Sequence, residues 1–386
     1  MRIPVVDKDG TPLMPTKPSR ARRWLREGKA VKRWSDLGVF YVQLTCDPSD
    51  TETQDVVVGI DPGKLYSGIG VQSAKATLFM AHLVLPFETV KKRMEQRRMM
   101  RRTRRSRRIN RNVSFQLRNH RQKRFDNRRG HKLPPSIRAN RELELRVVRD
   151  LAAIFPISGI VWEYVKADVD LTSGRKKARS GRGFSPVMVG QKFAIRRLEA
   201  IAPVVKMEGW ETANLRRQLG LAKSKDKASQ SPQSHAVDGL ALAASEFVSY
   251  ESFHTSQNHG KQWVGSVALT ECVFRVIRRP PVCRRQLHLL QPAKGGKRRN
   301  YGGTVTRHDF RKGDLVRAEM AGRQCIGWVS GDTARQVSVS DINWKRLGQF
   351  AASKVELLRR SVNLLASGAS TPAQPALVPP DTHAVA

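Results

Sequence analysis

The sequence predicts an α/β protein made of several modules, and three observations carry this prediction. Apolar runs that end at Gly or Pro, such as "VVVGIDPG" at 56–63, are typical of buried strands. Apolar residues recur at helical spacing in other segments, such as 140–154. A long basic segment, 90–129, contains neither Gly nor Pro and consists mainly of good helix formers. The chain has 386 residues, 39% of them hydrophobic, which is enough for two or three modest domains.

Residues 1–55 are predicted to form a small α+β module. A turn-rich start leads into a basic amphipathic helix near Ser19–Glu27 and then into the strand-like run "VFYVQLTC". About 50 residues bury too little surface to be stable alone, so we expect this module to lean on RNA or on the next domain. Residues 56–85 then predict successive hairpin-connected strands, because "SGIGVQS" and "TLFMAHLVL" continue the apolar pattern.

Residues 86–130 predict one long arginine-rich helix. Residues 91–129 hold 18 Lys and Arg against 2 Asp and Glu, and Gly130 followed by Pro134 and Pro135 ends the helix. Two neighbouring helical stripes carry the arginines, namely Arg97, Arg101, Arg104, Arg108 and Arg111 on one and Arg98, Arg102 and Arg105 on the other. Like charges four residues apart destabilise a bare helix, so this surplus predicts a partner that carries phosphates. A solvated charge run is the alternative.

Residues 131–255 predict alternating helices and strands. The amphipathic helix at 140–154 leads into the strand "GIVWEYV", and a second helix is expected around Val189–Ala202 after a polar loop. The segment "SHAVDGLALAASEFV" predicts a helix that starts near Ser234. Residues 256–365 change to short strand-like runs with Gly-rich turns, typical of a small β-barrel. The Pro-, Ala- and Ser-rich residues 366–386 are predicted to be disordered.

The charge of the chain predicts its class of partner. The 71 Lys and Arg outnumber the 33 Asp and Glu, which gives a formal net charge of +38. Such a charge opposes compaction unless polyanions neutralise it, so nucleic acid is the expected partner. The sequence has no run of 18 apolar residues and no signal-peptide core, so we expect a cytoplasmic protein without a membrane partner. The four cysteines form no C-x-x-C pair, which argues against a zinc ribbon and a disulfide scaffold.

Three acids occupy comparable places in the predicted elements. Asp61 ends an apolar strand, Glu163 does the same in "GIVWEY", and Asp238 lies in the first turn of a helix, three residues after His235. A separation of three puts His235 and Asp238 on one helical face. Each acid alone could be a turn residue, an exposed edge residue or a helix-terminal charge. Together they would repel one another unless cations bind, and two Mg²⁺ held by carboxylates can hydrolyse a phosphodiester.

These residues carry a resemblance to a known family. "GIDPG", "WE" and "HAVDG" resemble the three split motifs of the RuvC-like nucleases, which have the RNase H fold, and the arginine run resembles a bridge helix. The segment "PLMP" at Pro12–Pro15, with "SRARRWLREGKA" after it, is similar to the N-terminal module of the IscB and IsrB proteins, transposon-encoded relatives of type II CRISPR effectors. The resemblance covers about residues 3–360.

The resemblance implies an RNase H-like RuvC domain that is split by the arginine-rich helix. It also implies that Asp61, Glu163 and Asp238 are metal-binding carboxylates for two Mg²⁺, for which Mn²⁺ can substitute. His235 would be the assisting catalytic histidine.

The IscB and IsrB proteins differ by an HNH nuclease between motifs two and three. Residues 164–234 contain no histidine and are too short to hold an HNH fold together with the connecting elements. The sequence therefore resembles IsrB, which implies an RNA-guided nickase of the non-target strand. The implied partners are one large structured guide RNA per protein and a double-stranded DNA target with a short flanking motif. DNA binding would bring the protein to the nucleoid.

The C-terminal β module would read the flanking motif by the same resemblance. The candidate side chains are Arg307, Arg311, Lys312 and Arg317, although contact with a phosphate is the commoner role for any one of them. Two other functions stay open at this point. One is a guide-independent RuvC-like endonuclease that cuts branched DNA by its shape, and the other is a catalytically idle RNA-binding protein.

Overall fold

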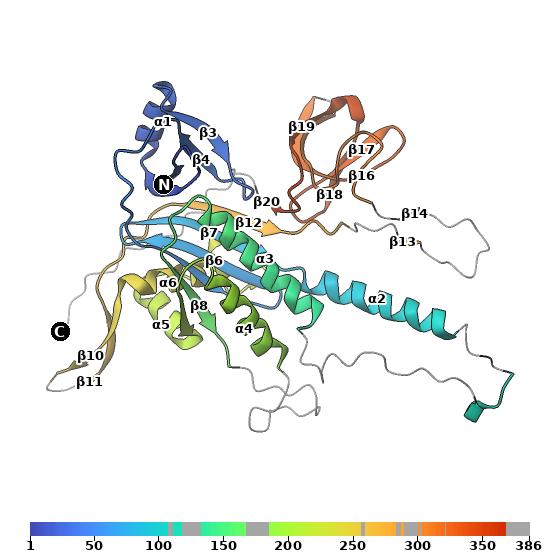
Figure 1. Cartoon of the computed structure of the whole chain (residues 1–386), viewed down its shortest axis with the longest axis horizontal. Helices are drawn as coiled ribbons and strands as arrows, with labels where there is room; N and C mark the ends of the chain where they lie inside the picture. The colour runs from blue at the N-terminus through green and yellow to red at the C-terminus, as the bar shows by residue number, and fades with distance from the viewer. Residues whose placement is uncertain are drawn as a thin grey trace. The chain divides into compact units, whose positions relative to one another are not determined.

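The computed structural model divides the described chain into two compact units, Met1–Lys32 with Tyr41–Phe274, and Arg33–Phe40 with the residues from Arg275 onward (Figure 1). It describes residues 1–106, 110, 112–117, 133–166, 185–255, 259–282, 287–288, 300–301, 303–320 and 322–367. The described α-helices are α1 (Pro18–Arg26), α2 (Phe87–Ser106), α3 (Pro135–Ala152), α4 (Pro186–Leu198), α5 (Gly209–Gln218) and α6 (Val237–Ala244). None of these helices is long and apolar enough to cross a membrane.

The chain begins with a small four-stranded sheet that agrees with the predicted α+β module. Its strands run in the order β2-β1-β4-β3, with bounds β1 (Ile3–Val6), β2 (Pro12–Thr16), β3 (Ala30–Trp34) and β4 (Phe40–Leu44). Helix α1 follows β2 and starts at Pro18, because proline needs no hydrogen-bond acceptor in the first helical turn. The helix and the strand predicted near 19–27 and 39–46 are confirmed.

A larger mixed sheet forms the centre of the first unit. Five of its seven strands concern the candidate site, namely β5 (Val56–Asp61), β6 (Tyr66–Ser73), β7 (Ala76–Val84), β8 (Gly159–Tyr164) and β9 (Val204–Glu208), in the order β7-β6-β5-β8-β9. The first three strands are antiparallel neighbours, as the hairpin pattern predicted, whereas β8 and β9 are parallel to β5. Every residue of β5 is buried, which explains its continuous apolar run.

The parallel pairing brings two of the acids to one edge of this sheet. Ile60 of β5 is paired with Trp162 of β8, so the next residues, Asp61 and Glu163, end neighbouring strands. Side chains alternate along a strand, so Val161 and Glu163 share one face while Trp162 points to the other. Helices α5 and α6 pack against Val161, and α3 places a guanidinium over the Trp162 ring. The acids therefore lie on the face that α5 and α6 cover.

Helix α6 packs directly on the backbone of β5 and β6 because glycines line the contact. A Cβ atom on Gly59 would lie 2.0 Å from the carbonyl oxygen of Gly239, and one on Gly70 would lie 2.5 Å from the backbone of Leu240. Any side chain at these positions would push the helix away from the sheet. The glycines of "VVVGID", "SGIG" and "HAVDG" thus allow the close approach that brings α6 to the end of β5.

The arginine-rich segment differs from its prediction. Helix α2 ends at Ser106, and the described residues beyond it are not α-helical, with a bend at 112–113 and a 3₁₀ turn at Phe115–Leu117. In the described residues beyond the helix, the Asn110 side chain accepts a hydrogen bond from the backbone N–H of Asn112 (3.0 Å), a local contact that competes with helical hydrogen bonds. The prediction of one helix to residue 129 was therefore wrong, since it considered only Gly and Pro as helix breakers.

Between β9 and the second unit the chain adds elements that the sequence had not predicted. Helix α5 follows β9 directly, and a hairpin of β10 (Ser249–His254) and β11 (His259–Val264) follows α6. The polar loop predicted before α4 lies mostly outside the described residues. A π-helical turn at Pro232–Ala236 precedes α6, close to the predicted helix start at Ser234.

The second unit contains an antiparallel sheet in the order β18-β17-β16-β15-β19. Its strands are β15 (Leu315–Met320), β16 (Arg323–Asp332), β17 (Gln336–Ser340), β18 (Arg346–Ala351) and β19 (Val355–Arg359). The other described strands in this part are β12 (Val273–Arg278), β13 (Leu287–His288), β14 (Asn300–Tyr301) and β20 (Leu365–Ala366). A small apolar core of Val316, Val329, Val337, Val339 and Phe350 holds the sheet together. The sequence predicted a small β-barrel here, whereas the described strands form an open five-stranded sheet whose outer strands are β18 and β19.

Candidate active site

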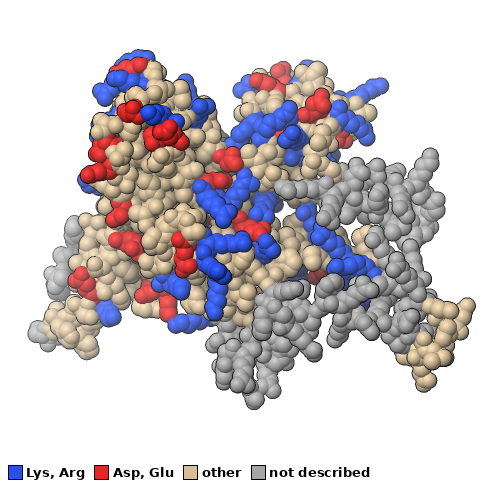
Figure 2. Space-filling view, in the orientation of Figure 1, with Lys and Arg blue, Asp and Glu red and all other residues tan. Residues whose placement is uncertain are grey.

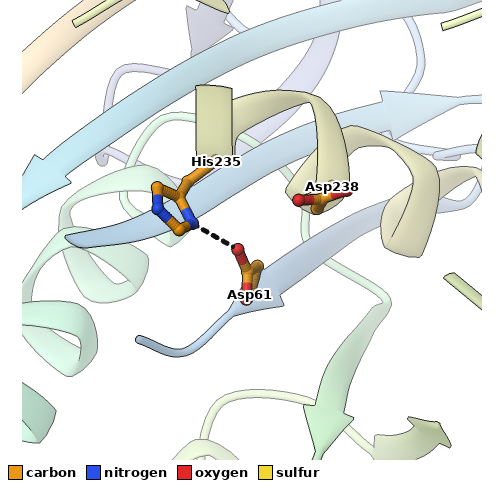
Figure 3. Close-up of side chains that lie close together, drawn as sticks. All are labelled: Asp61, His235 and Asp238. Carbon is orange, nitrogen blue, oxygen red and sulfur yellow. Dashed lines mark hydrogen bonds and ion pairs between the residues drawn. The ribbon is translucent and has the colours of Figure 1, made fainter. Parts of the chain in front are cut away.

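Asp61, His235 and Asp238 come together at the end of β5 (Figure 3). Asp61 is the last residue of β5, His235 lies in the π-helical turn, and Asp238 lies in the first turn of α6. The His235 Nδ1 atom is 2.8 Å from Asp61 Oδ2, and one possible ligand atom from each of the three residues lies within 4.8 Å of the others. Asp238 is only 2% exposed. Two carboxylates and one imidazole from distant segments thus form one compact cluster.

Glu163 lies beside this cluster and outside the three-residue group. It is half-buried on β8, next to Asp61 on β5. Burial raises the pKa of Glu163 to about 7, and the charges of Asp61 and Asp238 add to this rise. A hydrogen bond with Thr212 and the charge of Lys223 act in the opposite direction. Burial and the two neighbouring carboxylates thus both disfavour the charged form of Glu163.

Two cationic side chains neutralise Asp238. Arg216 of α5 places Nη1 2.5 Å from Asp238 Oδ1, and the Lys223 ammonium is ion-paired with Oδ2. Sequence reasoning missed both residues, because nothing distinguishes them among 71 Lys and Arg. Their only sequence signal is their position in the segment before "HAVD".

The turn that follows Asp61 is held by polar side chains of α3. Asn140 Nδ2 donates to the carbonyl oxygen of Lys64 (2.8 Å), and Arg141 Nη2 donates to that of Gly63 (2.7 Å). All of the α3 side chains that make such contacts are buried, which makes their hydrogen bonds with the turn costly to break. Helix α3 therefore fixes the backbone from which Asp61 projects.

Glu144 completes this set of contacts and is unusual for its burial. It is 1% exposed, and its Oε1 lies 2.9 Å from the Ser67 hydroxyl, which also contacts the carbonyl oxygen of Asp61 at 2.6 Å. Burial raises the pKa of Glu144 to about 7, although Arg141 at 3.1 Å opposes the rise. Glu144 lies within a helix that the sequence assigned only to packing, so its role was not predicted.

A second histidine supports the segment that carries His235. His82 of β7 is buried, and its Nδ1 lies 2.8 Å from the Ser234 hydroxyl. The rings of His82 and His235 lie 5.8 Å apart, and Tyr66 packs close to both. Burial lowers the pKa of His82 to about 4, so this ring is neutral near pH 7. A neutral His82 does not add positive charge beside His235.

The predicted arginine stripes are described only in part. Arg97, Arg98, Arg101 and Arg102 lie on α2 and are exposed. Arg104 and Arg105 belong to α2, but their side chains are outside the described residues, as are Arg108 and Arg111 altogether. Figure 2 shows Lys and Arg side chains gathered along α2 and around α3. This part of the face is basic, whereas Asp and Glu side chains are scattered over the rest of it.

The candidates for contact with a flanking motif lie in the second unit, around the start of β15. Arg307 Nε lies 4.0 Å from Asp332, and Arg317 Nη1 lies 2.9 Å from Glu356. Arg311 is exposed and Lys312 is half-buried. Two of the four are thus ion-paired with acids of their own sheet, and none belongs to the acid cluster.

Comparisons with solved structures give distant similarities. The chain is similar to Thermus thermophilus RuvC in complex with a Holliday junction substrate, at 17% identity and a TM-score of 0.26, over 49% of this chain and 90% of that one. A second Thermus thermophilus RuvC structure gives 15% identity and a TM-score of 0.22 over the same shares. A cryo-EM structure of a CRISPR-Cas12f ternary complex gives 13% and 0.27, over 59% of this chain and 49% of that one.

Comparisons of sequence give one match. No curated protein matches this chain. Residues 3–183 match the family model described as RRXRR protein, a pattern that "RRTRR" at 101–105 spells out. Asp61, Glu163 and α2 fall inside the matched range, whereas His235 and Asp238 lie beyond it. Residues 3–183, which are less than half of the chain, are therefore similar to the RRXRR family, and this region contains two of the four candidate site residues.

Proposed function

We propose that this chain is a RuvC-like, metal-dependent DNA nuclease whose active site consists of Asp61, Glu163, His235 and Asp238. The observation that carries the proposal is their convergence. Three segments that are far apart in the sequence deliver acids and an imidazole to one edge of a sheet. Buried acids repel one another and lower stability, so such a cluster is characteristic of a functional site.

The donor set fits a hard divalent cation such as Mg²⁺ or Mn²⁺. Asp61 and Asp238 offer carboxylate oxygens, His235 offers a ring nitrogen, and Glu163 lies next to Asp61. Carboxylate oxygens are the ligands that these ions prefer in proteins. Two bound ions would supply charge stabilisation at the scissile phosphate and a more acidic water. The residues that would hold them are Asp61, Glu163 and Asp238.

His235 is suited to receive a proton from the attacking water. Its Nδ1 contacts Asp61 Oδ2, so an N–H donated from Nδ1 would leave Nε2 as an acceptor. The same hydrogen bond fixes the orientation of the ring. His235 would therefore act as a general base that Asp61 orients.

We further propose that a guide RNA directs this site and that only one DNA strand is cut, the non-target strand. The exposed arginines of α2 support an RNA partner, because Arg binds phosphates through a rigid fork of donors. The RRXRR match covers the same helix. The absence of histidine from the sequence at 164–234 supports a single nuclease centre.

The test is a cutting assay with the full chain, its copurified RNA, a labelled DNA duplex that matches this RNA, and Mg²⁺. Asp61→Asn should abolish cutting while RNA binding, measured by filter binding, is retained. Asp55→Asn is the matched control, because Asp55 is exposed and directly precedes β5. Undiminished cutting by Asp61→Asn would refute the site, and cutting of branched DNA without RNA would favour a guide-independent nuclease.

A further inference from the structure

Asp238 carries two cationic partners in addition to its place among the candidate metal ligands. Both of its oxygens are engaged, Oδ1 by Arg216 and Oδ2 by Lys223. The carboxylate is 2% exposed, so water cannot replace these partners readily. A divalent cation bound to Asp238 would compete with both side chains for the same charge.

The two partners differ in how easily they can leave. Arg216 lies in the regular helix α5, and its side chain is 16% exposed. Lys223 lies in the irregular segment between α5 and the π-helical turn, and its side chain is 35% exposed. A lysine ammonium is a compact, well-hydrated charge on a flexible stem, whereas a guanidinium is a fixed planar fork. Lys223 is therefore the partner that can move away at the lower cost.

We propose that Lys223 is an exchangeable counter-ion of Asp238. In the metal-free site Lys223 pairs with this carboxylate. Once a divalent cation binds Asp238 in place of Lys223, the lysine pairs with a phosphate of the bound DNA strand. This inference rests on the proposed nuclease function. Pairing with Lys223 limits the repulsion among three neighbouring acids before a cation binds. The released ammonium then lies near the candidate active site, where a DNA phosphate would bind.

The first experiment measures the competition directly, without cutting. Mn²⁺ is titrated into the nucleic-acid-free full chain, and its affinity is measured by calorimetry. Lys223→Met should bind Mn²⁺ about tenfold more tightly than the unmodified chain, because one competing charge is gone. Lys223→Arg keeps the competing charge and should bind Mn²⁺ no more tightly than the unmodified chain. Lys225→Met is the matched control, because Lys225 is an exposed residue of the same segment, and it should change nothing.

Equal or weaker Mn²⁺ affinity of Lys223→Met would overturn the exchange. The melting temperature of each variant checks that it is folded, and Lys223→Gln provides a second neutral side chain that must give the same increase. Failure of the proposed nuclease function has a different signature, since the unmodified chain would then fail to cut DNA with Mg²⁺. The two outcomes are therefore distinguishable.

The second experiment tests the phosphate contact. A single-stranded oligonucleotide is bound to the full chain with Ca²⁺, which replaces Mg²⁺ without supporting cutting, or with EDTA. With Ca²⁺, Lys223→Met should bind more weakly, and its salt slope should be shallower by about 0.7, the loss of one phosphate contact. With EDTA the two proteins should bind alike, because Lys223 remains paired with Asp238. An equal loss under both conditions would refute the exchange.

Discussion

Gly68 shows how one residue without a side chain determines the position of a catalytic candidate. It lies on β6 opposite Asp61, and a Cβ atom on it would lie 1.7 Å from the carbonyl oxygen of His235. A clash between a Cβ atom and a backbone atom cannot be relieved by changing a rotamer. The π-helical turn can therefore approach the sheet this closely only because residue 68 is a glycine.

Gly68→Ala should therefore displace His235 and abolish cutting. We also expect a loss of about 1–3 kcal/mol of unfolding free energy, typical of overpacking, measured by urea denaturation. Gly159→Ala is the matched control in the same sheet, because its Cβ would meet only Val57, at an ordinary 3.8 Å. Full cutting activity of Gly68→Ala would show that the π-helical turn with His235 can shift without loss of catalysis.

Glu144 gives a prediction about pH. Its pKa is raised to about 7 from 4.5, so the folded state binds its proton more tightly than the unfolded state. The protonated form therefore contributes stability below about pH 4.5, and this contribution is lost as the pH rises through 7. The full effect is about 3 kcal/mol from the size of the shift.

Glu144→Gln removes this titration and keeps a similar shape. The unfolding free energies of both proteins should be measured by urea denaturation between pH 4.5 and 8. The unmodified chain should lose stability relative to Glu144→Gln as the pH rises. A constant difference across this range would mean that Glu144 does not change its protonation on unfolding.

At the scale of elements, the sequence could predict the strands and helix that carry the site. The all-apolar run of β5 and the helical spacing after His235 both come from burial, and burial is visible in the order of residue types. Parallel pairing of β5 with β8 was not visible, because it depends on the crossover through α3. The end of α2 was missed because the prediction considered only Gly and Pro as helix breakers, and not side chains such as Asn110 that hydrogen-bond to the local backbone.

The charged residues that contact the candidate site could not be predicted from the sequence either. The partners are far apart in the sequence. Arg216 and Lys223 precede Asp238 by 22 and 15 positions, and Glu144 follows Ser67 by 77 positions. Only the fold brings Arg216 and Lys223 to Asp238, and Glu144 to Ser67 of β6. A local pattern identifies residues that are close in the sequence, such as His235 and Asp238, and does not identify contacts between distant elements.

Helix α2 gives the element-scale prediction. Changing Arg97, Arg98 and Arg101 to Gln should weaken binding of the copurified RNA and make its salt dependence shallower by about 2 to 3 in slope. Changing the same residues to Lys keeps the charge and should largely keep the slope, which separates charge from guanidinium geometry. An unchanged affinity and slope for the Gln variant would show that this helix is only a solvated surface.

At the scale of the whole molecule, the formal net charge of +38 bears on how the acid cluster of Asp61, His235 and Asp238 would select its substrate. A large positive charge attracts any polyanion and supplies affinity without sequence information. Selective cutting therefore requires another source of specificity, and base pairing with a bound RNA would supply it. The RNA that copurifies should accordingly be one abundant species of defined sequence, measured by sequencing after nuclease-free purification. A random mixture of cellular RNA would contradict guided recognition.

The number of strands cut follows from the number of active sites. The part of the chain that the structure describes offers one cluster of three or more possible metal ligands, and the sequence at 164–234 has no histidine that could serve a second nuclease. One site accepts one scissile phosphate in one polarity, so one complex should produce a nick.

The displaced strand is the expected substrate, because it is single-stranded once the RNA has paired with its complement. A duplex with different labels on its two strands, incubated with protein, RNA and Mg²⁺, should lose only the displaced strand, and Asp238→Asn should abolish this cut. Equal RNA-dependent cutting of both strands would require either a second active site or one site that cuts twice on the same target. A time course would separate these two explanations, because a single site must cut the two strands one after the other.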